Sequence, residues 1–124
     1  MKNLIILITL LLSYNLNAQS TNSLYDGTWV GMGHQLDIGE SWSIQLNIKG
    51  DNYTILYPSF KCSAELTVIK KEGNKITLKE KINSGQCVND GNVELEIINS
   101  NTIRYKWSFS NGEPGSFSEL IKFN

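Results

Sequence analysis

The sequence predicts an all-β fold, specifically a single antiparallel up-and-down barrel of about eight strands. After residue 26, apolar and polar residues alternate with a period of two, and Gly, Asn, Asp and Ser separate the alternating runs. The runs are short and their connections brief, which favours a sheet that closes on itself and leaves no exposed edge. A two-sheet β-sandwich is the alternative that the same pattern allows.

The alternation differs in clarity from strand to strand. It is clearest between Trp42 and Ile48, where every second residue is apolar. It is weakest in the first strand, because Gly31 and Gly33 break the pattern and favour a bend or a bulge. In chain order, the expected strands are Gly27–Gln35, Trp42–Lys49, Tyr53–Tyr57, Cys62–Lys70, Lys75–Ile82, Asn92–Asn99, Thr102–Phe109 and Ser116–Phe123.

Charged residues on the fifth and sixth strands predict how these two strands pair. If Ile82 faces Val93, opposite charges meet on the outer surface, as cross-strand pairs prefer. Each exposed pair of this kind would contribute about 0–1 kcal/mol. The predicted outer pairs are Lys81 with Glu94 and Lys79 with Glu96.

The first residues have the pattern of a secretory leader. Lys2 supplies a positive charge, Leu4–Leu12 is an apolar run, and Leu16-Asn17-Ala18 is a small-residue exit. The apolar run is too short to span a bilayer comfortably, and no second such run follows. We therefore expect a signal peptide at 1–18, an N-terminal extension at 19–26 and a β-barrel domain at 27–124. The protein would be secreted or periplasmic, without membrane insertion after cleavage.

The charge balance excludes several classes of partner. Lys2 is the only charged residue of the leader, so cleavage changes the formal net charge from −1 to −2. So weak a field favours neither nucleic acid nor an anionic membrane nor a strongly charged substrate. We expect no nucleic-acid partner.

Cys62 and Cys87 are the only cysteines, and in an exported chain of this size they are predicted to form one disulfide. In an up-and-down barrel, the connections after strands one, three, five and seven share one end. Both cysteines belong to that end, where a bridge would stabilise the fold by about 3–4 kcal/mol. The connections there are mostly the longer ones: Leu36–Ser41, Pro58–Lys61, Asn83–Gly91 and Ser110–Gly115.

Strand parity predicts a candidate ligand site at the same end. Aromatic residues and two inward-facing carboxylates gather there, and buried carboxylates need hydrogen-bond partners, water or raised pKa values. The alternative is that these acids lie on the rim and reach water or a loop backbone. The expected ligand-binding residues are Trp42, Tyr57, Glu80, Trp107 and Glu119.

Catalytic and metal chemistry find little support in the sequence. His34, the only histidine, is expected to point outward near the loops, and neither Ser41 nor Ser43 lies in a nucleophile motif. Two cysteines and one distant histidine fit no zinc signature. We expect a protein that is not an enzyme, with no metal site and no cofactor.

Two sequence features carry a resemblance to known proteins. Gly27-Thr28-Trp29 resembles the Gly-x-Trp start of lipocalins, and avidin-type barrels begin in a similar way. The resemblance implies that Trp29 fills the closed end of a barrel. In lipocalins an arginine of the final strand partners this tryptophan, but here Arg104 lies one strand earlier and is expected to face outward.

The second feature spans most of the predicted mature chain. Tyr57-Pro58-Ser59-Phe60-Lys61-Cys62, then Glu80-Lys81-Ile82 and Gly85-Gln86-Cys87, resembles a pattern in uncharacterised exported bacterial domains. Similar domains are appended to bacterial serine/threonine kinases. The resemblance implies a barrel in an exported protein and no particular activity.

Two functions remain open at this point. The first is a non-catalytic binding barrel that takes a small apolar or amphipathic ligand at its loop-bearing mouth. The second is a protein-interaction module, such as an inhibitor of an exported hydrolase. Small periplasmic lysozyme inhibitors are disulfide-bearing barrels, but their Ser-Gly-x-x-Tyr motif is absent here. An internal cavity of a few hundred Å³ would favour the first function, and a filled interior with apolar loops would favour the second.

Overall fold

The computed structural model describes residues 25–35 and 40–124. The predicted signal peptide at 1–18, residues 19–24 of the predicted extension and residues 36–39 of the first long connection lie outside the described residues.

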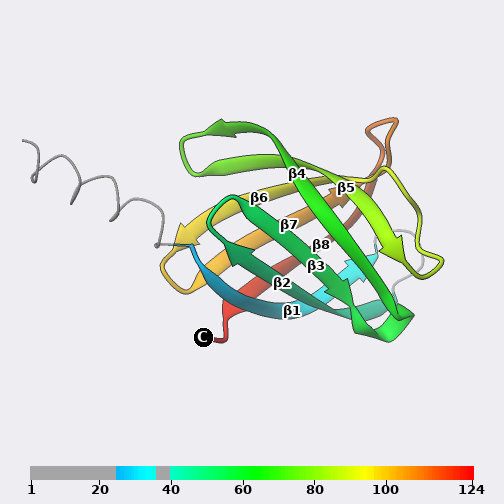
Figure 1. The fold of residues 1–124 in the computed structure, drawn as a ribbon, viewed down its shortest axis with the longest axis horizontal. Coiled ribbons are helices and arrows are strands. Elements are labelled where there is room, and N and C mark those ends of the chain that lie inside the picture. The colour runs from blue at the N-terminus through cyan, green and yellow to red at the C-terminus, as the bar shows by residue number, and fades with distance from the viewer. Residues whose placement is uncertain (1–24, 36–39) are drawn as a thin grey trace, which may run out of the picture.

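The described chain forms a closed antiparallel barrel of eight strands (Figure 1). Consecutive strands pair with each other, and the first strand also pairs with the last, which excludes the sandwich. The observed bounds differ from the predicted ones by at most two residues. The strands are β1 (Gly27–Gln35), β2 (Ser41–Lys49), β3 (Asn52–Tyr57), β4 (Cys62–Glu72), β5 (Lys75–Ser84), β6 (Asn92–Asn99), β7 (Thr102–Ser108) and β8 (Pro114–Lys122).

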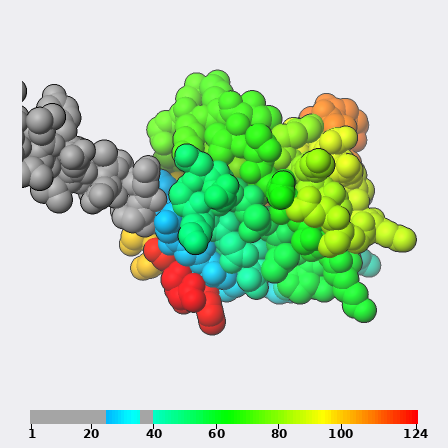
Figure 2. Space-filling view, in the orientation of Figure 1, coloured from blue at the N-terminus to red at the C-terminus, as the bar shows by residue number. Residues whose placement is uncertain are grey.

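The two ends of the barrel differ, as the connection lengths predict. Tight turns follow β2, β4 and β6 at one end, which we call the closed end. The connections after β1, β3, β5 and β7 lie at the other end, which we call the loop end, and a short 3-10 helix, η1 (Pro58–Phe60), forms one of them. Figure 2 shows the β5–β6 connection, in yellow-green, projecting from the molecule at the loop end.

The closed end is filled by apolar side chains around Trp29. Its indole has no exposed surface, and its Nε1–H donates to the Tyr25 carbonyl oxygen at 3.1 Å. Lys122 of the final strand places its ammonium 5.6 Å from the centre of the same ring, within the range of a cation–π contact. The side chains without exposed surface are Trp29, Leu46, Ile55, Leu78, Val93, Leu95, Ile103 and Leu120.

The predicted register of β5 and β6 is wrong by four residues. Val93 lies opposite Leu78 and not opposite Ile82. The seven-residue β5–β6 connection accounts for the shift, because β5 continues past the start of β6 and the amide of Glu80 donates to the Gly91 carbonyl oxygen. A shift of four residues leaves every side chain on its predicted face, since the side-chain period of a strand is two.

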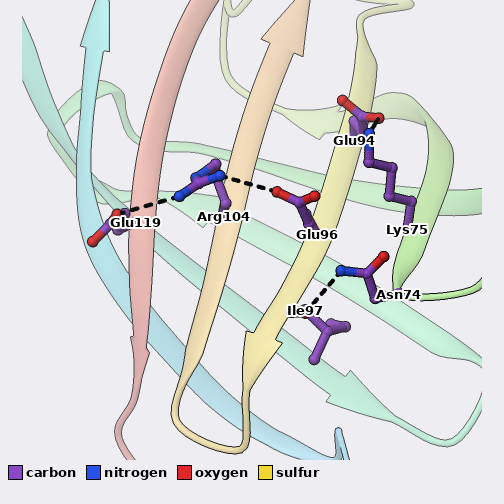
Figure 3. Close-up of polar contacts among 7 residues, drawn as sticks. All are labelled: Asn74, Lys75, Glu94, Glu96, Ile97, Arg104 and Glu119. Carbon is purple, nitrogen blue, oxygen red and sulfur yellow. Dashed lines mark hydrogen bonds and ion pairs between the residues drawn. The ribbon is translucent and has the colours of Figure 1, made fainter.

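The outer charges consequently find other partners. Arg104 of β7 lies between Glu96 of β6, at 3.1 Å, and Glu119 of β8, at 4.0 Å (Figure 3). Lys75 approaches Glu94 at 3.9 Å on the neighbouring strand. These groups are exposed or half-exposed, so each pair contributes about 0–1 kcal/mol. The predicted pairs Lys81–Glu94 and Lys79–Glu96 do not form, and Lys79 donates to the Asn92 side chain instead.

The predicted inner face of β8 is also wrong. Ser116, Ser118 and Leu120 are buried, whereas Phe117 and Ile121 are about half exposed on the outer wall. The reason lies on the neighbouring β1, where a Cβ at Gly31 would come within 2.9 Å of both Ser118 and Leu120. The Ser118 and Leu120 side chains therefore occupy the interior space that Gly31 leaves beside β1.

Candidate functional site

A cavity of about 400 Å³ opens at the loop end of the barrel, and we call it the cup. Six of its fourteen lining residues are aromatic, and Glu80 is the one carboxylate among them all. None of these residues is a lysine, an arginine or a histidine. The lining residues are Gln35, Trp42, Tyr57, Phe60, Cys62, Glu80, Gln86, Cys87, Val88, Tyr105, Trp107, Phe109, Gly115 and Ser116.

Glu80 is held in the cup by two hydrogen bonds, and its side chain is almost completely buried. The Tyr57 hydroxyl donates to Oε2 at 2.5 Å, and the Trp107 indole N–H donates to Oε1 at 3.1 Å. The Tyr57 oxygen also lies 2.8 Å from that of Tyr105. Since Tyr57 has one hydroxyl proton and uses it on Glu80, Tyr105 is the donor of this second bond. The result is a polar chain from Tyr105 through Tyr57 to Glu80.

The surroundings of this chain shift the pKa of each titratable member upward. Burial raises the pKa of Glu80, although the hydrogen bonds from Tyr57 and Trp107 act in the opposite direction. Burial likewise raises the pKa of Tyr57, to which Tyr105 and Glu80 add, and the pKa of Tyr105, to which Glu80 adds. Both tyrosines therefore keep their protons at ordinary pH, and Glu80 is the member of the chain that titrates.

Two glycines make room for the Trp107 indole. Gly91 precedes β6 and Gly115 lies on β8, and a Cβ at either position would overlap the indole ring. The ring is thus held between two backbones, with Phe109 edge-on to it at a centroid distance of 4.8 Å. This close approach directs Nε1–H toward Glu80.

The η1 turn closes one side of the cup. Pro58 starts the turn with its fixed φ, and Lys61 ends it in the left-handed conformation, with a φ of 54°. The Ser59 hydroxyl accepts a hydrogen bond from the Ser43 amide at 3.1 Å, which fastens the turn to β2. Phe60 consequently lies against the Trp42 ring, with 5.3 Å between the ring centres.

The predicted disulfide between Cys62 and Cys87 is present, with a Cα–Cα distance of 6.2 Å. It joins the first residue of β4 to the β5–β6 connection and so places Gln86 and Val88 on the rim of the cup. Disulfides persist in oxidising compartments outside the cytoplasm. The same connection is further fixed by the Asn89 side chain, which accepts a hydrogen bond from the Ile82 amide.

The structure brings together four of the five predicted site residues. Trp42, Tyr57, Glu80 and Trp107 line the cup, from four different strands. Glu119 does not, because β8 has the opposite phase, and its carboxylate lies on the outer wall beside Arg104 (Figure 3).

Sequence reasoning did not assign several other lining residues to the site. Tyr105 could have been found from strand parity, since it lies on the same face as Trp107. Ser116 could not, because the apolar residues of β8 predicted the wrong face, and Gly115 lies at the register shift between β7 and β8, which alternation does not predict. Phe60 and Val88 lie on connections, where alternation gives no information.

His34 is exposed on the outer wall, as predicted. Its Nδ1 lies 3.0 Å from the Ser41 hydroxyl, and its ring is tilted against that of Phe117, with 5.6 Å between the ring centres. Within the described residues, no carboxylate is hydrogen-bonded to this ring, so the pair lacks the third member of a hydrolase triad. The part of the chain that the structure describes also contains no group of three or more potential metal ligands.

No known protein family matches the chain, and no curated protein matches it either. In residues 25–35 and 40–124, no helix is long and apolar enough to cross a membrane. The interpretation of the cup therefore rests on its own geometry and chemistry.

Proposed function

We propose that this chain is an exported, non-catalytic binding barrel that holds a small ligand with an apolar body in the cup. The observation that carries the proposal is the cup itself, a cavity of about 400 Å³ lined by six aromatic rings, with one carboxylate in its wall. Small-molecule sites have volumes of roughly 300–1,000 Å³ and combine apolar walls with a few placed polar groups. Export is supported by the leader pattern and by the disulfide.

The lipocalin-like part of the proposal is supported by the closed end. Lipocalins pair their first-strand tryptophan with a cation of the last strand, and Lys122 of β8 lies over Trp29 here. A lysine in this place supplies the positive charge that the missing arginine would otherwise bring. The likeness concerns the architecture alone and names no ligand.

A neutral fluorescent probe tests the proposal. N-phenyl-1-naphthylamine should bind with saturation at one site per chain and gain fluorescence in the aromatic cup. Gln86→Trp places an indole at the rim and should weaken binding at least about tenfold, since a filled mouth excludes the probe. Lys71→Trp, on the exposed β4–β5 hairpin, is the matched control and should bind as the wild type does. Absent saturation, or equal weakening by both variants, would contradict the proposal.

A second candidate function is supported by the rim. Phe60 and Val88 are about half exposed at the loop end, which is also what a protein-binding surface requires. Both residues line the cup, however, so the ligand proposal already accounts for their exposure. If native mass spectrometry of the exported protein from its own host shows a bound protein and no small molecule, the interaction module is the better reading.

A further inference from the structure

We propose that the ligand of the cup is a small organic cation, whose ammonium group lies at Glu80 while its apolar body lies against the aromatic wall. The inference rests on the proposed function and specifies the ligand class. It begins with Glu80, because a carboxylate in an apolar cavity is costly unless something compensates it.

The hydrogen bonds to Glu80 do not use its full capacity. A carboxylate can accept about four hydrogen bonds, and Glu80 accepts one at each oxygen from the described residues. Both donors are neutral groups, Tyr57 and Trp107. Trp107 can only donate, so Oε1 is necessarily an acceptor. An ammonium ion, which only donates, matches the acceptor sites that remain.

No protein cation competes for this carboxylate within the described residues. The groups that face Glu80 from β3 and β7 are Tyr57, Tyr105 and Trp107, and all three are uncharged. The inward residues of the adjacent β4 are apolar, and on the other side the Glu80 amide donates to the carbonyl oxygen of the uncharged Gly91. The described ion pairs lie elsewhere, on exposed parts of the strands. A positive charge is therefore what the site lacks.

The wall of the cup suits the same ligand class. Six aromatic rings line it, and a ring whose face meets a cation attracts it by roughly 0.5–1 kcal/mol at an exposed site and about 2 kcal/mol where water is excluded. An anionic head group would be repelled by this carboxylate, and no lysine, arginine or histidine is among the lining residues to bind it. The six rings are Trp42, Tyr57, Phe60, Tyr105, Trp107 and Phe109.

Charged residues around the mouth of the cup also favour a cation, although more weakly. The described parts of the four connections at the loop end carry three carboxylates and one ammonium group. They are Glu40, Asp90 and Glu113 against Lys61. Such an excess attracts cations to the entrance and is screened by salt.

A series of ligands with one body and three head groups tests the inference in the wild-type protein. Decylammonium, decanol and decanoate have similar unbranched apolar chains, and their head groups are positive, neutral and negative; the decylammonium head carries N–H groups that can donate to Glu80. By calorimetry or tryptophan fluorescence, below the micelle concentration, the ammonium compound should bind at least about tenfold more tightly than decanol. Decanoate should bind most weakly. The ammonium affinity should fall as the pH is lowered through the pKa of Glu80, because the neutral acid attracts a cation less.

Matched variants locate the effect. In Glu80→Gln the advantage of the ammonium compound over decanol should disappear, whereas Glu119→Gln, which removes the same charge from the outer wall, should keep it. If decanol binds at least as tightly as the ammonium compound in the wild type, the cation inference is overturned and the binding barrel stands. If none of the three ligands binds and Gln86→Trp changes nothing, the proposed function itself has failed.

Discussion

Removal of the disulfide should cost this barrel a large share of its stability. Cys62 and Cys87 are separated by 25 positions, and the chain-entropy treatment gives a closure entropy of about 12 cal/mol/K for such a loop. At 25 °C this corresponds to about 3.5 kcal/mol, against a total of roughly 5–15 kcal/mol for a typical domain. The double variant Cys62→Ala with Cys87→Ala should therefore unfold at a markedly lower denaturant concentration.

Urea unfolding followed by tryptophan fluorescence measures this cost. The oxidised wild type, the wild type with reductant and the double variant are compared, and the last two should agree within about 1 kcal/mol. The slope of the free energy against urea should rise slightly without the bridge, because an uncrosslinked unfolded chain exposes more surface.

Two results would refute this reasoning. If the double variant lies within about 1 kcal/mol of the oxidised protein, loop closure is not a main source of stability. If Cys62 of the exported protein reacts freely with an alkylating reagent, the bridge does not form. The intact protein should instead have the mass of the free-thiol form less two hydrogens.

Three further predictions concern the closed end, the indole of the cup and the buried acid. Trp29→Ala should lower the free energy of unfolding by about 3–5 kcal/mol in the same urea assay, since the indole is fully buried; a cost below 1 kcal/mol would show that the end is filled otherwise. Gly115→Ala should cost about 1–3 kcal/mol and change the emission of Trp107, because the added methyl overlaps its ring; an unchanged spectrum and stability would contradict the packing. Burial raises the pKa of Glu80 above its ordinary value of 4.5, so the folded state binds its proton more tightly than the unfolded state. The stability of the wild type relative to Glu80→Gln should thus be greatest below pH 4.5 and fall as the pH rises through the raised pKa; a pH-independent difference would contradict this.

The sequence predicts the strands well because the signal for each strand lies in its own residues. Alternation identifies the elements, and turn residues bound them, which is why the strand limits agree within two residues. The inward position of Glu80 was also predictable, although the register that accompanied it was wrong. Parity alone decides which face a residue occupies, and the slip of four residues preserved it.

The errors in register and in the inner face of β8 arise because both depend on how separate strands pack together. Charge pairing could not fix the β5–β6 register, because exposed pairs contribute too little to choose between two registers of equal parity. Apolar residues on β8 suggested that Phe117 and Ile121 face inward, but Ser118 and Leu120 fill the interior space beside Gly31 of β1. The place of Glu119 depended on this same choice. The interior volume depends on how all eight strands pack together, so it cannot be predicted from the residues of one strand.

The polar chain inside the cup has a consequence for how the barrel opens. Tyr57, Glu80 and Tyr105 belong to β3, β5 and β7, and no two of these strands are neighbours in the sheet. These hydrogen bonds therefore cross the interior of the barrel and connect strands that are not paired with each other in the sheet. Opening any one of the three at the loop end would leave buried polar groups unpaired on the other two. These strand ends should accordingly exchange their amide hydrogens as one cooperative unit, and an occupant bound to Glu80 should slow all three together.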